Sequence, residues 1–265
     1  MSASAAPEKA VLIIPGAWHV PEHFNKLTAA LESNGIRVIC HRLPTSQNAE
    51  SADTTIRDDV LFIQDVVKQQ AALGTHLIVV AHSYGGMVAA SLAEFAVAPE
   101  SSQGGVIAFV FLAAFLPTED QSIVSVFGST LPTFLATGPG GMIKCTEPML
   151  CFFDDVNISA EEAQWANSLI VEYIHPSTNL APVPSDKAAW RVIPSTYVFC
   201  EKDVILPPEV QDRMIQTARA QGAVVHVHRL PSCHSPFLSM PEQVTQLILR
   251  AGGLSASTSS ALPQS

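Results

Sequence analysis

The sequence is poor in charged residues, and poorest in positive ones. Charged residues make up only 14% of the 265 positions, and 14 Lys and Arg stand against 24 Asp and Glu, for a net charge of −10. This balance disfavours nucleic acids and anionic membrane surfaces, because their phosphates attract basic patches. We therefore expect neither as a partner.

Long hydrophobic segments and cofactor motifs are also missing. No run approaches the roughly 18 apolar residues of a membrane span, and the first ten residues have no apolar stretch typical of a signal peptide. The chain has no dinucleotide glycine pattern and no phosphate-binding Gly-Lys motif, so we expect no cofactor. The cysteines are odd in number and lack metal-ligand spacing, which predicts reduced thiols in a cytoplasmic protein: Cys40, Cys145, Cys151, Cys200 and Cys233.

Apolar residues make up 48% of the chain, enough for the core of one large α/β domain. Short apolar runs alternate with segments of helical periodicity, which predicts a mostly parallel, doubly wound sheet. The expected strands are 11–14, 36–40, 77–80, 105–115, 196–200 and 224–230. The expected helices are 24–34, 54–73, 86–97, 208–220 and 241–251.

The alternation breaks after Phe115 and resumes near Trp190. Between them are two helix-like pieces, 122–127 and 160–169, and loops rich in Gly and Pro. We interpret 117–190 as a helical cap inserted over one end of the sheet, with 1–116 and 191–252 as the core. The Ser- and Ala-rich end, 253–265, is predicted to be a disordered tail.

Ser83 follows a buried strand and precedes a helix, in the sequence Ala81-His82-Ser83-Tyr84-Gly85. Such a turn is sharp and presents the serine hydroxyl as a nucleophile at the sheet edge. The same serine could instead only cap the helix. If it is a nucleophile, the N–H of Tyr84 points from the helix N-terminus toward the same place.

A serine nucleophile needs a base, and histidine with a carboxylate partner supplies one near neutral pH. His234 follows the last strand and Asp203 follows the one before it, so the chain order is Ser, Asp, His. His234 could also be an ordinary loop histidine. Three other carboxylates near strand ends remain alternatives to Asp203: Glu201, Glu119 and Asp120.

The loop after the first strand, Pro15-Gly16-Ala17, is expected to supply a second oxyanion donor, the N–H of Ala17. Four aromatic residues are candidates for an apolar pocket under the cap: Trp18, Phe115, Trp165 and Tyr173. The histidine pairs His19/His23 and His226/His228 lack accompanying carboxylates or cysteines. We therefore expect surface or packing histidines there and no metal site.

These motifs resemble the α/β-hydrolase superfamily over Lys9 to Gly252. The similarity is greatest to the small branch of plant methyl esterases and hydroxynitrile lyases, with bacterial and fungal relatives. It implies a triad of Ser83, Asp203 and His234, oxyanion donors at Ala17 and Tyr84, and a cap over the site. Gly16 and Ser235 replace a threonine and a lysine of the hydroxynitrile lyases, which argues against cyanohydrin cleavage.

The leading hypothesis is a serine hydrolase that cleaves an ester, thioester or lactone of a small apolar molecule through an acyl-enzyme. The alternative uses the same groups as a general base for lyase, retro-aldol, dehydration or cyclisation chemistry, without an acyl-enzyme. A third hypothesis is a non-catalytic ligand receptor. A homodimer is compatible with the sequence.

Overall fold

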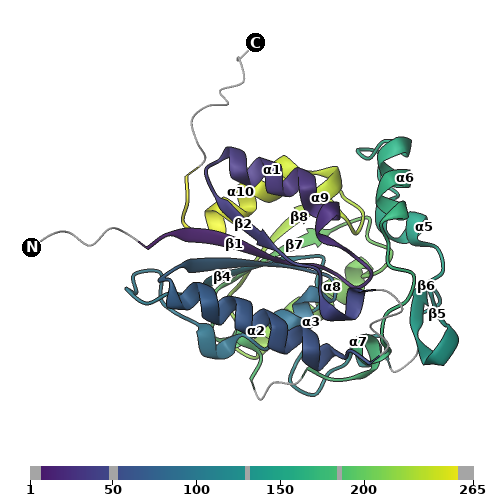
Figure 1. The fold of residues 1–265 in the computed structure, drawn as a ribbon, viewed down its shortest axis with the longest axis horizontal. Helices are drawn as coiled ribbons and strands as arrows, with labels where there is room; N and C mark the ends of the chain where they lie inside the picture. Colours follow the sequence, from purple (N-terminus) through teal and green to yellow (C-terminus); the bar gives the residue numbers. More distant parts are fainter. Residues whose placement is uncertain (1–6, 48–52, 129–131, 184–186, 256–265) are drawn as a thin grey trace, which may run out of the picture.

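A six-stranded parallel sheet forms the centre of the computed structural model, which describes residues 7–47, 53–128, 132–183 and 187–255. The order is β2-β1-β3-β4-β7-β8 (Figure 1), with every neighbouring pair parallel. The strands are β1 (Lys9–Ile14), β2 (Arg37–Cys40), β3 (His76–His82), β4 (Gly105–Leu112), β7 (Ser195–Cys200) and β8 (Val225–Leu230). The strand order reverses between β1 and β3, and ligands of open α/β sheets bind at the carboxyl ends of the strands at such a point.

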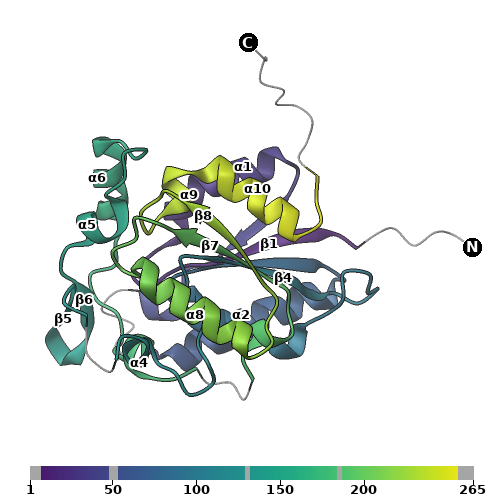
Figure 2. The ribbon, with the colours of Figure 1, turned by 180° about the vertical axis from the view of Figure 1, so that it is seen from behind.

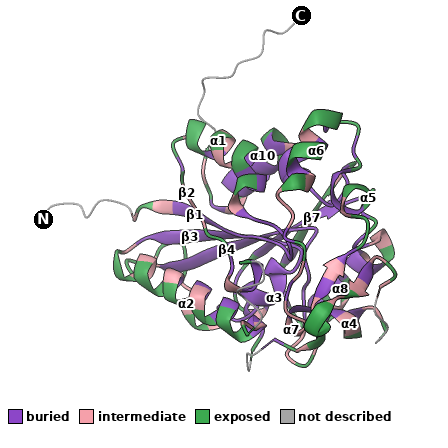
Figure 3. Cartoon of the chain, turned by 45° about the vertical axis from the view of Figure 1, so that its right-hand side comes forward, coloured by how far each residue is buried: buried purple, intermediate pink, exposed green. Residues whose placement is uncertain are grey.

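Helices cover both faces of the sheet (Figures 1 and 2). One face carries α1 (Asn25–Ser33), α9 (Pro236–Ser239) and α10 (Pro241–Ala251), and the other carries α2 (Ile56–Ala72), α3 (Gly85–Ala89) and α8 (Pro208–Ala220). Strands covered on both faces need apolar residues at every position rather than at alternate ones. Accordingly, β3 and β4 are buried from end to end (Figure 3).

Segment 117–190 lies at the carboxyl ends of the strands, at the right of Figure 1. Its start and end are joined, because the Trp190 indole N–H donates to the Pro117 carbonyl at 2.8 Å and Arg191 binds Glu119. Its helices are α4 (Ile123–Val126), α5 (Pro148–Phe153), α6 (Ala160–Ser168) and α7 (Ser177–Leu180). The sequence predicted a helical cap here, but the segment also contains two strands. β5 (Leu135–Thr137) and β6 (Ile143–Cys145) pair as an antiparallel hairpin.

The helix after Ser83 is shorter than its pattern predicts. It ends at Ala89 instead of continuing to Val97: Ala93–Phe95 form a 3₁₀ turn, and the Val97 N–H donates to the carbonyl of Val106 in β4. Single 3₁₀ turns complete the connections at Pro21–Phe24, Pro44–Ser46, Ala93–Phe95, Pro139–Gly141 and Ala189–Arg191.

The ends of the described chain meet on the side away from segment 117–190. The Lys9 ammonium donates to the Gly252 carbonyl at 2.8 Å, which joins the start of β1 to the end of α10. The expected tail begins at Gly253, and residues 256–265 lie outside the described residues. In the described ranges, no helix is both long enough and apolar enough to cross a membrane.

Candidate active site

Ser83 occupies the sharp turn between β3 and α3. Its φ is +50°, a left-handed conformation that is uncommon for a residue with a side chain. Its backbone is held from both sides: the N–H donates to Leu112 at 3.3 Å, and the carbonyl accepts from Phe115 at 3.1 Å. After Tyr84, Gly85 and Gly86 let the start of α3 lie against the backbone of Ile14 and Phe115. The turn leaves Ser83 8% exposed at the carboxyl edge of the sheet.

Asp203 and His234 meet in the loops after β7 and β8. The His234 Nδ1 and the Asp203 Oδ2 are 2.7 Å apart, and both side chains are fully buried. The other oxygen of Asp203 accepts from the N–H groups of Ile205 and Leu206 at 2.8 and 2.9 Å. Because a carboxylate only accepts, the Nδ1 of His234 carries the hydrogen and Nε2 presents its lone pair. That tautomer is the one a general base needs.

His234 packs against the residue that precedes Ser83. The rings of His82 and His234 are 4.8 Å apart, and the His82 Nε2–H donates to the His234 carbonyl at 3.0 Å. In the described part of the chain, His234 Nε2 has no hydrogen-bond partner, so no bond to the Ser83 hydroxyl is formed. Catalytic hydrogen bonds are often absent without substrate and form in the complex.

Two backbone N–H groups beside Ser83 are uncommitted. Among the described residues, no protein group accepts a hydrogen bond from Ala17 or Tyr84 N–H. Both residues line a cavity together with Ser83. The neighbouring Trp18 has a φ of +64°, and the His19 N–H closes the turn onto the Gly16 carbonyl at 3.1 Å. The two amides are therefore available to an anion formed at Ser83.

The cavity at Ser83 has apolar walls and is small. Its volume is about 20 Å³, enough for about one water molecule. Of the four aromatic residues expected in a pocket, Trp18 and Phe115 line this cavity, whereas Trp165 and Tyr173 lie elsewhere. Trp165 is 40% exposed on α6, and Tyr173 packs against Gly138 beside the β5–β6 hairpin. Segment 117–190 contributes other side chains that the sequence did not single out: Ile123, Phe127, Pro132, Phe134, Leu135 and Asn179.

The three carboxylates considered as alternatives to Asp203 lie away from His234. Glu119 binds Arg191 in a two-pronged ion pair, which lowers the pKa of Glu119 to about 2, and it also accepts from the Ala188 N–H. Asp120 and Glu201 are exposed. Of the four candidates, the structure brings only Asp203 to His234.

A buried carboxylate that the sequence reading missed supports Tyr84. The Tyr84 hydroxyl donates to Asp59 at 2.6 Å, and Asp59 also accepts from the hydroxyl and the N–H of Thr45 at 2.7 and 2.9 Å. Burial raises the pKa of Asp59 to about 6, although all three hydrogen bonds oppose that rise. A signal was available in the sequence: Asp59 interrupts the apolar stripe of Ile56, Val60 and Ile63.

The buried histidines around the site serve in packing. His19 lies with its ring 4.9 Å from that of His82, and His23 donates or accepts only at backbone groups. Burial lowers the pKa of His19, His23 and His82, which keeps these imidazoles neutral near pH 7. Within the described ranges, no group of three or more His, Cys, Asp or Glu is placed to hold a metal ion.

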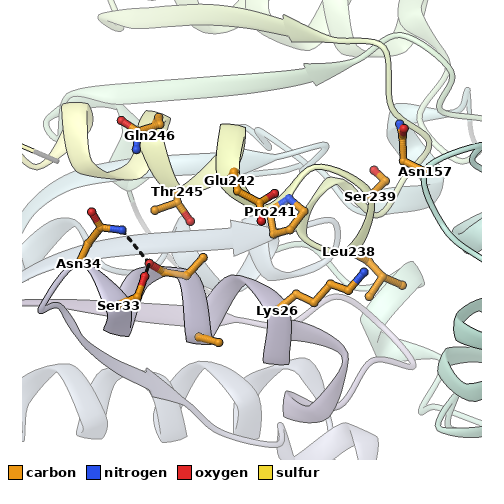
Figure 4. Close-up of a pocket in the computed structure, with 12 residues that line it drawn as sticks. Lys26, Ser33, Asn34, Asn157, Leu238, Ser239, Pro241, Glu242, Thr245 and Gln246 are labelled. Carbon is orange, nitrogen blue, oxygen red and sulfur yellow. Dashed lines mark hydrogen bonds between the residues drawn. The ribbon is translucent and has the colours of Figure 1, made fainter. Parts of the chain in front are cut away.

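A hollow much larger than the one at Ser83 lies elsewhere. An open groove of about 730 Å³ runs between α1 and α10 (Figure 4), and its lining includes Lys26, Glu242 and Thr245. None of Ser83, Asp203 and His234 lines it. Size alone therefore does not identify the reactive site, and the convergence of nucleophile, base and amides does.

Comparison with known proteins assigns the family. The profile described as the Alpha/beta hydrolase family matches residues 11–247, nearly the whole chain. The chain belongs to the alpha/beta hydrolase family. It is therefore a hydrolase enzyme, and the parallel sheet with flanking helices is the fold of that family.

Two fungal relatives of this hydrolase cover nearly its whole length. It is 26% identical over 250 residues to Alpha/beta hydrolase nvfD of Aspergillus novofumigatus, which covers 92% of this chain and 96% of the relative. It is 28% identical over 253 residues to Probable hydrolase R7 of a Phoma species, which covers 92% of this chain and 98% of the relative.

Solved structures share the fold at lower identity. A pyrethroid hydrolase from Sphingobium faniae matches with a TM-score of 0.70 at 19% identity, covering 93% of this chain and 97% of that one. Polyneuridine aldehyde esterase matches with a TM-score of 0.71 at 19% identity, covering 92% and 98%. An Arabidopsis methylesterase matches with a TM-score of 0.69 at 17% identity, covering 93% and 99%.

Proposed function

We propose that this hydrolase is a serine esterase that cleaves an ester, thioester or lactone of a small apolar molecule through an acyl-enzyme. The observation that carries the proposal is the buried pair of Asp203 and His234, 2.7 Å apart and packed on the turn that bears Ser83. The apolar cavity walls support an apolar substrate. Segment 117–190 serves as the cap that covers it.

The reaction proceeds in two halves. His234 Nε2 takes the proton of Ser83 as the hydroxyl oxygen attacks the substrate carbonyl carbon, while Asp203 stabilises the imidazolium. The N–H groups of Ala17 and Tyr84 donate to the oxyanion. The imidazolium then protonates the leaving alcohol or thiol, which leaves an acyl group on Ser83. His234 then takes a proton from water as the water oxygen attacks the acyl carbonyl, and the imidazolium returns this proton to the Ser83 oxygen as the bond to the acyl group breaks and the acid leaves.

A fluorophosphonate probe tests the proposal, because it traps only an activated serine. We expect the wild-type protein to gain one adduct on Ser83 and the Ser83→Ala variant to gain none. The same substitution should lower ester turnover by at least about 10³-fold, since the nucleophile is lost. Ser91→Ala is the matched control: this buried serine lies just after α3, its hydroxyl donates to the Val88 carbonyl at 2.7 Å, and removal of the hydroxyl should leave labelling intact.

Intact-mass spectra recorded during turnover add a second readout. An acyl adduct on the wild-type protein would support the proposed mechanism. Turnover of a substrate with no adduct, in a protein that the probe does not label, would contradict it. The general-base alternative would then be favoured.

A further inference from the structure

The loop that carries His234 is held from outside the core. Cys233, immediately before the histidine, is 3% exposed and binds a part of the chain about 80 residues away. Its N–H donates to Asp155 Oδ2 at 2.9 Å, and its thiol donates to the Phe152 carbonyl at 3.2 Å. Asp155 lies between α5 and α6, in segment 117–190. The two contacts attach the histidine loop to the end of α5.

Asp155 is itself fixed in one orientation. Its second oxygen, Oδ1, accepts from the backbone N–H and the side-chain amide of Asn157, both at 3.0 Å. The residue is 8% exposed. A buried N–H such as that of Cys233 needs an acceptor, and a carboxylate that already has two other donors is a strong and immobile one.

The position of His234 depends on few contacts. Its imidazole binds Asp203, its carbonyl accepts from His82, and its ring lies 5.9 Å from that of Phe152. None of these holds Cys233, the residue before it. Within the loop, the Ser232 hydroxyl donates to the Cys233 carbonyl at 3.0 Å, and the bond from the Cys233 N–H to Asp155 ties this residue to segment 117–190. A rotation there would swing Nε2 relative to Ser83, and displacements near 1 Å can cost about 100-fold in rate.

We propose that Asp155 is a positioning residue for His234: it holds the Cys233 N–H and so aims the imidazole at Ser83. This inference rests on the proposed function, because it assigns His234 the role of base. It makes α5 a fixed support of the catalytic machinery rather than a moving part of the cap. The cavity wall is built instead from α4, β5 and α7, and none of its lining side chains comes from α5 or α6.

The experiment compares three variants of the full chain. Asp155→Ala removes the acceptor, Asp155→Asn keeps one acceptor oxygen in the same shape, and Asp154→Ala removes the neighbouring exposed carboxylate as a control. All are assayed well below their thermal midpoints, so that loss of folded protein does not enter. We expect kcat of Asp155→Ala to fall about 10- to 100-fold with KM unchanged. The kcat of Asp155→Asn should fall less, and the kcat of Asp154→Ala should equal that of the wild type.

Proton NMR gives a readout that does not depend on turnover. The hydrogen between His234 Nδ1 and Asp203 gives a resonance far downfield, identified by its absence in His234→Ala. We expect this resonance to broaden or shift in Asp155→Ala and to persist in Asp154→Ala. If Asp155 has only a structural role, Asp155→Ala will have a lower thermal midpoint but an unchanged resonance and an unchanged kcat. That result would overturn the inference.

The two proposals fail differently. If the wild-type protein is never labelled at Ser83, the proposed function fails, while the NMR comparison still reports whether Asp155 positions the imidazole. If labelling succeeds and Asp155→Asn and Asp155→Ala both retain wild-type kcat and resonance, only the inference fails. Should Asp155→Ala not fold, Asp155→Asn carries the test alone, and wild-type kcat and resonance in that variant overturn the inference.

Discussion

Backbone strain marks the reactive edge of the sheet at the scale of single residues. Among the described residues, positive φ angles outside glycine occur at Trp18, Ser83 and Ala113. These follow β1, β3 and β4 at their carboxyl ends, where the candidate site lies. Such conformations cost about 1–3 kcal/mol each and persist only where packing enforces them. Here the hydrogen bonds around Ser83 and the closed turn at Gly16 enforce them.

Asp59 makes stability depend on pH. Its pKa is about 6 in the folded protein against an ordinary value of 3.8, because burial disfavours the charge. Between these values the folded state binds more protons than the unfolded state, so its stability falls as pH rises from about 4 to about 6. The loss is on the order of 3 kcal/mol.

Urea unfolding of the wild type and Asp59→Asn at several pH values measures this contribution. The difference in free energy of unfolding, wild type minus variant, should decrease across that interval and then stay level up to pH 8. The same comparison for Asp58→Asn, an exposed neighbour, should show no such decrease between pH 5 and 6. If the difference in free energy of unfolding between the wild type and Asp59→Asn does not change with pH, the raised pKa of Asp59 is contradicted.

At the scale of elements, the helix after Ser83 packs by direct backbone contact. A Cβ on Gly86 would lie 2.1 Å from the Phe115 carbonyl oxygen, and one on Gly85 would lie 2.4 Å from the Ile14 carbonyl oxygen. These are backbone atoms at the end of β1 and in the segment after β4, and they cannot move aside cheaply. Two glycines thus set how close α3 comes to the sheet.

Gly86→Ala should therefore cost about 1–3 kcal/mol of stability and should also slow probe labelling of Ser83, because α3 must shift. Gly222→Ala is the control: its φ is +86° but no atom lies within 4 Å of the new Cβ. It should cost about 1–2 kcal/mol from backbone strain and leave labelling unchanged. Thermal denaturation and labelling rates measure both effects. Equal labelling of the two variants would show that the close contact does not position Ser83.

Helices could be predicted accurately from the sequence where a residue such as proline marks their start and apolar residues recur along one face. The predicted bounds of α8 and α10 match the structure, since each begins with a proline and has a continuous apolar stripe. The β5–β6 hairpin and α5 escaped prediction because strands of three residues and a six-residue helix show no periodicity. Asp203 and His234 could be predicted because their order after Ser83 follows a known pattern. Asp155 could not be predicted, because no motif links it to Cys233, which is 78 residues away.

At the scale of the whole molecule, the cavity at the candidate site is small. At about 20 Å³ it is too small for the proposed ester substrate, so we expect α4 or the hairpin to move outward when substrate binds. One bond that opposes this joins Arg213 of α8 to the Val126 carbonyl at the end of α4, at 2.8 Å. A hydrogen bond of this kind contributes on the order of 1 kcal/mol.

Arg213→Ala should therefore raise kcat/KM for a bulky ester about fivefold, because the open state becomes more populated. A small acetate ester should respond less, and amide hydrogen exchange in α4 should accelerate. Arg57→Ala, at an exposed position of α2, provides the control. Unchanged exchange in α4 together with unchanged activity would exclude this bond as a restraint on opening.

The bond between Lys9 and Gly252 has a practical consequence. It brings the two ends of the folded chain to one side of the molecule, with the reactive edge on the other (Figure 1). A reporter group attached beside Lys9 or Gly252 would therefore lie opposite the reactive edge. A short linker between these two positions would permute the chain without rerouting any strand of the sheet.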